Sequence, residues 1–415
     1  MPLRIELWNG QRIDLSHDAP RVTIRVPHAG ALRHLLSPSP LSLYTLGRAY
    51  VEGAIDVSGR ASDMIAVVNA LARAASSKPA RRTPWWGQDW LGARLASLRR
   101  RHTRERDADA IRYHYDVSNE FYAAWLDPAM VYSCAYFEHG NETLAQAQVR
   151  KIEHILRKID LRPGQRLLDI GCGWGALVIH AARRYGAHCV GITLSENQAR
   201  LARERVRQAG LDGLVEIRLE DYRDVSGSFD RITSVGMFEH VGLQHLPAYF
   251  RRLRELLADD GVAMNHGLTS TDVRSREAPY GGGQFIQRYV FPHGELAHLG
   301  TVLQAMQEGG LEARDIENLR RHYARTCQLW TDNFEGKAEH IRKLTDEKRF
   351  RIWHVYLAGC SYAFLHDWIS IYQVVCSKAG RDPAAIPWSR AYMYAQPAQQ
   401  QALADEYAAL GYADP

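Results

Sequence analysis

Short apolar runs alternate with amphipathic stretches over the middle of this chain, from residue 144 to residue 266. The runs have the length of buried strands, and the stretches between them carry apolar residues at helical spacing. This pattern predicts strands at 166–171, 188–193, 214–219, 229–235 and 260–266. It predicts helices between them, for example at 176–185, 196–208 and 246–257. Alternating strands and helices joined by right-handed crossovers predict an α/β fold with one doubly wound, Rossmann-like parallel sheet.

The region before this pattern has a different character. Residues 1–75 mix short alternating stretches, such as 21–26, with helical ones, which indicates a small α+β unit. Residues 76–89 are rich in Pro, Ser, Gly and charge and are typical of a linker or a mobile loop. We therefore predict an N-terminal domain with its linker at 1–105 and a second domain at 106–415.

Two later segments interrupt or follow the alternation. Residues 268–295 are Gly-rich and contain Tyr280-Gly-Gly-Gly, and a loop of that length is usually functional. Residues 337–379 are mostly helical and aromatic in character, and they include a predicted apolar helix over 353–375. We expect both segments to surround a binding site of the second domain.

Composition places the chain among intracellular globular proteins. It has 415 residues, of which 46% are hydrophobic, and its six cysteines include no C-x-x-C pair, as expected of reduced cytosolic thiols. The N-terminus carries no charged segment followed by an apolar core, so we expect no signal peptide. No run of 18 apolar residues predicts a membrane span.

The excess positive charge lies in the first quarter of the chain. Residues 1–110 hold 17 Lys and Arg against 10 Asp and Glu, with the densest run at 98–106. Together with Trp85, Trp86 and Trp90, this run suits an anionic membrane surface. A solvated helix face for the basic run, and packing of the Trp side chains onto the next domain, are the structural alternatives.

The most informative motif is Leu168-Asp-Ile-Gly-Cys-Gly-Trp-Gly175, where a predicted buried strand breaks into alternate glycines and enters a helix. Such glycines let the backbone approach a ligand closely, and the helix start offers free N–H groups to it. The spacing is not the G-x-G-x-x-G of nicotinamide enzymes. With Asp169 two residues before the first glycine, it resembles the first motif of S-adenosylmethionine-dependent methyltransferases. A tight strand–helix turn without a ligand is the alternative.

In a doubly wound sheet, the loops after the strands line one crevice. Thr193 and Gln198 are candidates for the ribose of a nucleoside cofactor, with Glu196 as a second ribose candidate. Asp221 and Tyr222 are candidates for its base. The second strand of most such methyltransferases ends in an acid, whereas this one ends in Ile192-Thr193.

Several further motifs, in one order along the chain, resemble the cyclopropane-fatty-acyl-phospholipid synthases, a family that includes the mycolic acid cyclopropane synthases. The motifs are Tyr115-Asp-Val-Ser-Asn-Glu-Phe121, Tyr132-Ser-Cys-Ala-Tyr-Phe137, Gly191-Ile-Thr-Leu-Ser195, Asp221-Tyr-Arg-Asp224, Ser234-Val-Gly-Met-Phe-Glu-His-Val-Gly242, Tyr289-Val-Phe-Pro292, His322-Tyr-Ala-Arg-Thr326, and Arg351-Ile-Trp353 leading to Cys360. The resemblance covers roughly 110–395, and Gly47-Arg-Ala-Tyr-Val-Glu-Gly-Ala-Ile-Asp56 is similar to the family's lipid-binding domain. It implies a class I methyltransferase fold that binds S-adenosylmethionine and releases S-adenosylhomocysteine (SAH). The implied cofactor-binding residues are Tyr132, Ser133, Asp169, Gly171, Cys172, Gly173, Gly175, Thr193, Leu194, Ser195, Gln198, Asp221 and Tyr222.

The implied reaction sets clear demands on the site. An isolated cis double bond is a weak nucleophile, so methyl transfer to it leaves a carbocation, and closing a cyclopropane requires a base. The site must align the two reactants and exclude water. Aromatic faces stabilise a cation in such a pocket, and ordinary core packing is the alternative for each candidate. The candidates are Tyr136, Phe137, Phe238, Tyr280 and Tyr323.

By resemblance, the base is a bound bicarbonate ion. Its implied holders are Cys134, Glu239, His266, Leu268 and Tyr323, with Cys134 and Leu268 acting mainly through the main chain. Main-chain N–H groups and a Tyr hydroxyl can hold an anion, and a Glu beside a His can orient it and relay its proton. Taken separately, His266 could be a structural histidine, and Glu239 could bind the cofactor.

Cys360 matches a cysteine regarded as an active-site residue of the family. Because the alkene attacks the cofactor directly, the chemistry gives a protein nucleophile no task. We therefore interpret Cys360 as a buried thiol that lines the acyl tunnel, and keep it as a catalytic candidate.

Other functions fit the sequence less well. His240 and His245 lie near Glu239 without metal-ligand spacing, so we expect no metal. A nucleic-acid methyltransferase would carry Asn/Asp-Pro-Pro-aromatic where this chain has Met237-Phe-Glu-His, so we expect no nucleic acid partner. A noncatalytic lipid carrier with a degraded methyltransferase fold, and a relative that makes a methyl-branched, methylene or furan-precursor chain, remain alternatives.

The sequence thus predicts an enzyme that modifies the unsaturated acyl chains of membrane phospholipids. It would act from the cytoplasm, peripherally attached to the inner face of the membrane through its basic run and Trp residues. The resemblance also implies a homodimer.

Overall fold

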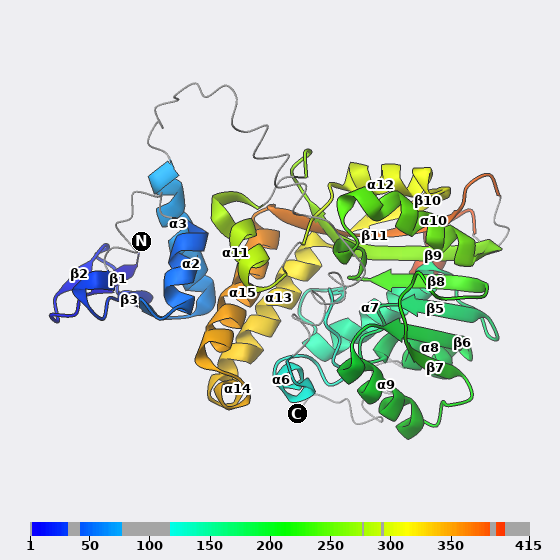
Figure 1. Cartoon of the computed structure of the whole chain (residues 1–415), viewed down its shortest axis with the longest axis horizontal. Coiled ribbons are helices and arrows are strands. Elements are labelled where there is room, and N and C mark those ends of the chain that lie inside the picture. Colours follow the sequence, from blue (N-terminus) through cyan, green and yellow to red (C-terminus); the bar gives the residue numbers. More distant parts are fainter. Residues whose placement is uncertain are drawn as a thin grey trace.

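The computed structural model describes residues 2–31, 42–76, 117–275, 278–291, 294–381 and 387–394. These residues form a small four-stranded sheet near the N-terminus and a seven-stranded sheet in the second part of the chain. Figure 1 shows the two sheets at opposite ends of an elongated molecule, with α11, α13 and α15 between them. The predicted basic run and Trp85, Trp86 and Trp90 lie outside the described residues.

The N-terminal unit contains four short strands and two helices. The elements are β1 (Leu3–Glu6), β2 (Arg12–Asp14), β3 (Val22–Arg25), α2 (Leu43–Val51), β4 (Asp56–Ser58) and α3 (Ala61–Ser76). The sheet order is β2-β1-β3-β4, with β1 and β3 parallel. The alternating stretch 21–26 predicted a strand with one buried face, and Val22 and Ile24 of β3 are indeed buried. They pack with Leu46 and Tyr50 of α2 in a core of this unit.

The seven-stranded sheet confirms the predicted doubly wound arrangement. Its strands are β5 (Arg166–Ile170), β6 (His188–Thr193), β7 (Val215–Leu219), β8 (Phe229–Val235), β9 (Leu257–Ser270), β10 (Leu311–Asn318) and β11 (Ile369–Lys378). The order is β10-β11-β9-β8-β5-β6-β7, and β5 to β9 are mutually parallel where they pair. Chain connections run in opposite directions from β5, so the crevice expected for a ligand lies at its carboxyl end.

Helices cover both faces of this sheet, as Figure 1 shows. One face carries α7 (Leu144–Lys158), α8 (Ala176–Tyr185) and α9 (Glu196–Gln208), and the other carries α10 (Leu246–Leu256) and α12 (Leu299–Glu308). Neighbouring residues of β5 point to opposite layers: Leu167 packs with α7 and α8, and Leu168 with α10. Continuous apolar strands are expected where both faces are covered.

A third group of helices lies between the sheets. It comprises α6 (Asn119–Ala123), α11 (Gly282–Tyr289), α13 (Arg320–Gly336), α14 (Ala338–Leu344) and α15 (Glu347–Leu365). Aromatic side chains of α6, α13 and α15 form much of their core, including Phe121, Trp330 and Trp353. The Gly-rich segment 268–295 is therefore not a continuous loop, because β9 extends to Ser270 and α11 follows.

The predicted apolar helix over 353–375 is wrong in its second half. The helix α15 ends at Leu365, Asp367 has a φ of 59°, and the chain then enters strand β11. The β-branched residues Ile369, Ile371 and Val374 favour a strand, which here pairs antiparallel with β9.

Polar contacts join the N-terminal unit to the central helices. Arg351 of α15 forms an ion pair with Asp56 at 3.0 Å and donates to the Tyr50 carbonyl at 2.9 Å. The Tyr289 hydroxyl of α11 donates to Glu52 Oε1 at 3.0 Å, and Lys348 forms an ion pair with Glu52 at 3.1 Å. These contacts fix the N-terminal unit against α11 and α15.

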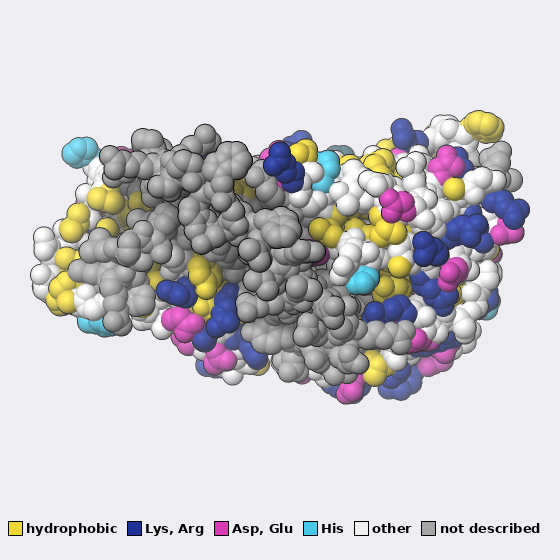
Figure 2. Space-filling model, turned by 45° about the horizontal axis from the view of Figure 1, so that its top comes forward, with side chains coloured by type: hydrophobic (Ala, Val, Ile, Leu, Met, Phe, Trp, Pro, Cys, Tyr) yellow, Lys and Arg dark blue, Asp and Glu magenta, His cyan; other side chains and the backbone are white. Residues whose placement is uncertain are grey.

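Within the described residues, no helix is both long enough and apolar enough to cross a membrane. On the face seen in Figure 2, Lys and Arg side chains lie among Asp and Glu side chains over the part that holds the seven-stranded sheet.

Candidate active site

The strand–turn–helix motif has the geometry that its glycines predicted. Gly171, Gly173 and Gly175 have φ values of 82°, 55° and 86°, a region that disfavours other residues. The N–H groups of Gly171 and Cys172 donate to the Ile192 carbonyl at 3.0 and 2.9 Å, which ties the turn to β6. A Cβ atom on Gly173 would meet nothing within 4 Å, so open space adjoins the backbone there.

This space belongs to a cavity of about 150 Å³, the glycine cavity, at the carboxyl ends of β5, β6 and β8. The residues predicted to bind a cofactor that line it are Tyr132, Ser133, Asp169, Gly171, Cys172, Gly173, Thr193, Leu194, Gln198, Asp221 and Tyr222. Gly175 and Ser195 do not line it. Gly175 is instead the N-cap of α8, and the Ser195 side chain caps α9 by accepting from the Gln198 N–H.

Polar side chains of the glycine cavity are already ordered by one another. The Thr193 hydroxyl donates to Gln198 Oε1 at 2.8 Å, and Asp221 accepts two bonds from the Arg223 guanidinium, at 2.8 and 2.6 Å. The Tyr222 ring packs edge-on against Tyr249. Glu196, the second ribose candidate, is exposed at the start of α9 and does not line the cavity.

Asp169 and Lys151 are the charged groups buried at this cavity. Asp169 accepts from the Thr233 hydroxyl at 2.7 Å, and burial raises the pKa of Asp169 to about 6. Lys151 of α7 donates to Ser133 Oγ at 2.9 Å, and burial lowers the pKa of Lys151 to about 8. Lys151 could not be predicted from the sequence, because it lies in none of the motifs and 18 positions from its partner.

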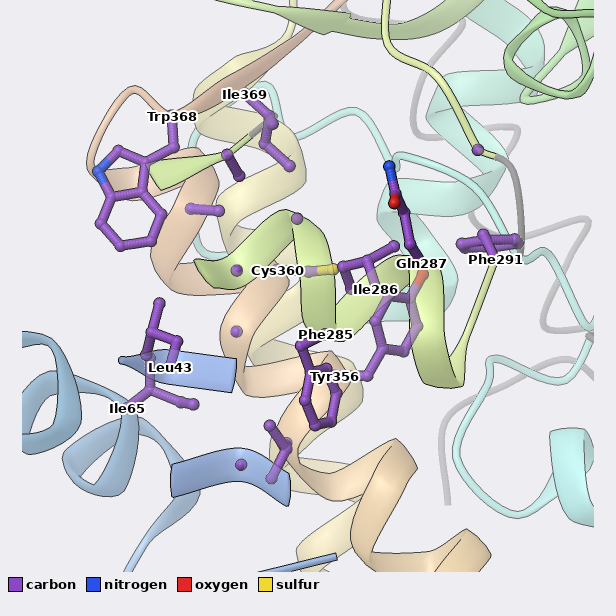
Figure 3. A pocket seen from close by; sticks show the side chains of 18 of the residues that line it. Leu43, Ile65, Phe285, Ile286, Gln287, Phe291, Tyr356, Cys360, Trp368 and Ile369 are labelled. Atoms are coloured by element: carbon purple, nitrogen blue, oxygen red, sulfur yellow. The ribbon is translucent and has the colours of Figure 1, made fainter. Parts of the chain in front are cut away.

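A second cavity, of about 320 Å³, runs between the N-terminal unit and the second part of the chain. Figure 3 shows side chains from both parts around it, with Leu43 and Ile65 on the N-terminal side and Phe285, Tyr356 and Cys360 on the other. We call it the apolar cavity, because its lining is predominantly hydrophobic. The two cavities share the lining residues Tyr132, Ser133, Gly236 and His240.

Glu239 and His266 line the apolar cavity, and Glu239 lies between Gly236 and His240, which line both cavities. Glu239 follows β8 in a short 3-10 helix, and its Oε1 accepts from the Leu268 N–H at 2.6 Å. Its Oε2 is buried without a hydrogen-bond partner among the described residues. Burial raises the pKa of Glu239 to about 7, so protonated and ionised forms coexist near neutral pH.

His266 is fixed by the strand next to it. Gln373 of β11 is its register partner, and the Gln373 side-chain amide donates to His266 Nδ1 at 3.0 Å. Complete burial lowers the pKa of His266 well below its ordinary value, so the imidazole is neutral. With Nδ1 accepting, the proton lies on Nε2, which is buried without a partner among the described residues.

The remaining predicted holders of an anion are placed differently. Tyr323 and Leu268 line the apolar cavity, but the Leu268 N–H is engaged by Glu239. Cys134 is fully buried, lines neither cavity, and directs its thiol to the Ala135 and Leu319 carbonyls. The structure thus brings Glu239, His266, Leu268 and Tyr323 to one cavity and leaves the Cys134 side chain outside it.

Cys360 lines the apolar cavity from α15, as expected of a thiol in the wall of a tunnel. Burial raises the pKa of Cys360 to about 12, so the thiol is protonated at neutral pH. Tyr323 is the only one of the aromatic candidates whose described side chain lines the cavity. The apolar cavity is not lined by Tyr136, Phe137 or Phe238. The structure does not describe the side chain of Tyr280. Tyr132 and Tyr356, whose hydroxyls are 3.1 Å apart, supply further aromatic lining.

Comparisons with known proteins agree with this geometry. Residues 102–374 match the family model described as mycolic acid cyclopropane synthetase. A Pseudomonas putida protein named "Probable fatty acid methyltransferase" is 44% identical over 397 residues, which cover 95% of this chain and 96% of that protein. The cyclopropane-fatty-acyl-phospholipid synthase of Escherichia coli K12 is 37% identical over 287 residues, covering 69% of this chain and 72% of that one.

The same family emerges from solved structures. A crystal structure of the mycolic acid cyclopropane synthase CmaA1 complexed with SAH and CTAB superposes with a TM-score of 0.62 at 33% identity. The match covers 65% of this chain and 98% of that one. The chain belongs to the mycolic acid cyclopropane synthetase family and has the Rossmann-like fold of class I S-adenosylmethionine-dependent methyltransferases.

Proposed function

We propose that this protein transfers a methylene unit from S-adenosylmethionine to the cis double bond of an unsaturated phospholipid acyl chain and forms a cyclopropane. The observation that carries the proposal is the meeting of the two cavities. Glu239 and His266 line the apolar cavity, and this cavity shares four lining residues with the glycine cavity.

The glycine cavity fits the cofactor. The open backbone at Gly173 admits a close approach, Thr193 and Gln198 offer partners for the ribose, and Asp221 and Tyr222 offer partners for the base. When bound, S-adenosylmethionine supplies a methyl group attached to a cationic sulfur. The residues shared by the two cavities would direct that group toward the lipid.

The apolar cavity fits a hydrocarbon chain. Its walls come from β3, α2 and α3 on one side and from α11 and α15 on the other, and they are largely aliphatic and aromatic. Excluding water from a carbocation is the main task of such walls, and Tyr132, Tyr323 and Tyr356 offer it aromatic faces.

Closing the ring requires removal of one proton from the transferred methyl group. Glu239 Oε2 and His266 Nε2 are buried polar atoms that have no hydrogen-bond partner within the described ranges, and such atoms call for a polar ligand. The neutral His266 Nε2–H and a protonated Glu239 can both donate to bicarbonate, and Tyr323 adds a hydroxyl on the same cavity. Bicarbonate would supply the base there.

Product analysis tests the function. The purified protein, S-adenosylmethionine and vesicles of unsaturated phospholipid should yield acyl chains that have gained one CH2. Glu239→Gln should reduce the rate by at least about 100-fold while SAH binding is retained. Unchanged lipid modification by Glu239→Gln would favour the alternative of a noncatalytic lipid carrier that copurifies with an enzyme.

A second product class is favoured by the relative named a fatty acid methyltransferase, which matches almost the whole chain. A 1,2-hydride shift that moves the cation onto the carbon bearing the new methyl group, followed by loss of a proton from that methyl group, gives a methylene-branched chain of equal mass. Ozonolysis of the product distinguishes the two, because it cleaves a methylene group and leaves a cyclopropane intact.

We also propose that the protein works as a homodimer at the cytoplasmic face of an anionic membrane, attached by residues 98–106, Trp85 and Trp86. Each basic side chain near such a surface contributes about 1 kcal/mol, so attachment should be reversible and sensitive to salt. Sedimentation with anionic vesicles at low and high salt tests the attachment, and insensitivity to salt would contradict it. Equilibrium ultracentrifugation tests the dimer.

A further inference from the structure

Lys151 is a buried cation that the structure leaves incompletely satisfied. Its side chain lines the glycine cavity, and the residue is 2% exposed. Among the described residues, its ammonium group makes one hydrogen bond, to Ser133 Oγ at 2.9 Å, although it carries three donors. No ion pair with a described carboxylate accompanies that bond. A buried ammonium in this situation is costly unless a further acceptor arrives.

The two carboxylates near enough to influence Lys151 have partners of their own. Asp127 accepts from the N–H groups of Ala129 and Val131, at 2.9 and 2.8 Å. Asp169 accepts from the Thr233 hydroxyl and also lines the glycine cavity. Both carboxylates favour the charged form of Lys151 without closing an ion pair with it.

Lys158 on the same helix shows how this fold satisfies a buried lysine. It is 1% exposed and forms ion pairs with Glu317 at 2.6 Å and Asp315 at 3.5 Å. Lys158 lines neither cavity. The charge of Lys158 is therefore neutralised by carboxylates of the protein itself, whereas Lys151 lines a cavity that can hold a ligand.

The helix that carries Lys151 also fixes Ser133. One turn earlier on α7, Gln148 Nε2 donates to the carbonyls of Val131 and Ser133, at 3.3 and 2.8 Å. The segment 131–133 is therefore held in place from α7. The Lys151 ammonium and the Ser133 hydroxyl form a rigid pair of donors beside the turn that follows Asp169.

We propose that Lys151 and Ser133 bind the carboxylate of the cofactor's amino-acid end, while Asp169 faces its ammonium group. This inference rests on the proposed function. A cation with a hydroxyl, and an anion on the same cavity, complement a zwitterion. The loops after β6 and β7 would hold the nucleoside, and Lys151 and Ser133 would hold the amino-acid end. Together they would fix the orientation of the sulfur atom that joins these two parts of the cofactor.

The test compares two ligands that differ only at that end. SAH carries the amino acid, and 5′-methylthioadenosine keeps the nucleoside and the thioether without it. Calorimetry on the full chain at pH 7 measures both affinities. Lys151→Met should weaken SAH binding by about 10- to 100-fold and change 5′-methylthioadenosine binding by less than about threefold.

Lys158→Met is the matched control, since it removes an equally buried lysine from the same helix, and it should leave the ratio of the two affinities unchanged. Lys151→Gln keeps a donor for Ser133 and removes the charge, so it replaces Lys151→Met if that variant does not fold. It should likewise lower the affinity for SAH relative to the affinity for 5′-methylthioadenosine. Equal weakening of both ligands, or no change in their ratio, would overturn the role of Lys151. Failure of the wild-type protein to bind either ligand would instead refute the proposed cofactor, and this inference with it.

Discussion

At the scale of single residues, the candidate site contains buried polar atoms that find no partner in the part of the chain that the structure describes. Glu239 and His266 both line the apolar cavity, and each has one atom fixed by a neighbour, the Leu268 N–H and the Gln373 amide, and one buried atom with no partner among the described residues. This division holds each side chain in a single orientation and reserves the other atom for a ligand.

Glu239 should make the stability of the protein depend on pH. Burial raises its pKa from 4.5 to about 7, so the folded protein binds this proton more tightly than the unfolded chain does. The wild type therefore loses stability as pH rises from 4.5 through about 7, and Glu239→Gln does not. We expect the variant to be more stable by about 3 kcal/mol at pH 8 and by about 1 kcal/mol at pH 5.

Urea denaturation of both proteins at the two pH values measures this difference. Gln keeps an oxygen that can accept from the Leu268 N–H, so the variant removes the charge and little else. A difference in unfolding free energy that is the same at pH 5 and pH 8 would contradict the raised pKa of Glu239.

Cys360→Ser tests whether the thiol has a chemical task. Because burial keeps the thiol protonated and the group only lines the cavity, we expect the rate of lipid modification to stay within about fivefold of the wild type. Cys376→Ser, at a buried thiol away from both cavities, controls for the cost of a buried hydroxyl. A loss of several orders of magnitude confined to Cys360→Ser would assign Cys360 a catalytic role.

The residues that lie in motifs were predictable from the sequence, whereas the residues that support them were not. Glu239 follows β8 in a loop that was expected to line the crevice. His266 ends the strand predicted at 260–266, although β9 continues to Ser270. Gln373 and Lys151 could not be predicted in the same way, because strand pairing and helix packing bring them to partners 107 and 18 positions away. Cys134 lies in a family motif, yet its side chain is turned into the core.

At the scale of elements, the turn between β5 and α8 determines what the glycine cavity can hold. Gly173 lines the cavity, whereas Gly186 ends the same helix away from it, and both have a left-handed backbone. A Cβ atom at either position would meet nothing within 4 Å. The two glycines therefore differ mainly in whether they face a ligand.

Gly173→Ala and Gly186→Ala should each lower the unfolding free energy by about 1–2 kcal/mol, the cost of a left-handed alanine. Only Gly173→Ala should weaken SAH binding, by at least about tenfold, because its methyl group would occupy space next to the backbone. Thermal unfolding and calorimetry of the two variants measure both quantities. Equal SAH affinities would show that the cofactor does not approach this turn.

The βαβα run was predictable because each strand there is a short apolar run and each helix has a clear period. The final strands were not. In β10 (Leu311–Asn318) half of the residues are charged, and only the polar pair His366-Asp367 interrupts the apolar sequence between α15 and β11. The change from α15 to β11 depends on β-branched residues and on pairing with β9, and such pairing is not local information.

At the scale of the whole molecule, the N-terminal unit forms one wall of the apolar cavity. Side chains of β3, α2 and α3 lie on that wall, and ion pairs such as Arg351–Asp56 hold the unit in place. Almost the whole CmaA1 chain matches, but the match covers only 65% of the present chain. The rest of the present chain therefore has no counterpart in CmaA1. The sequence indicated a small unit at 1–75, but the shared cavity emerged only from the packing of residues far apart in the chain.

Filling the N-terminal end of the cavity should change which lipids react. Met64 of α3 lines the cavity, and Met64→Trp would shorten the space for hydrocarbon. We expect the ratio of rates for long against short unsaturated chains to fall by about tenfold, with SAH affinity unchanged. Ala70→Trp, on the exposed face of α3, is the control. An unchanged ratio would show that the acyl chain does not reach α3.

Because the N-terminal unit forms one wall of the apolar cavity, the preference for tail length and the chemical outcome at the double bond should depend on different parts of the chain. Glu239 and His266, which we propose act at the reactive carbon, lie just after β8 and on β9. The far wall of the apolar cavity, where we propose that the acyl tail lies, comes from helices about 200 residues earlier in the chain. Grafting the first 76 residues of one relative onto the second part of another should therefore exchange the preferred tail length without altering the chemical outcome at the double bond.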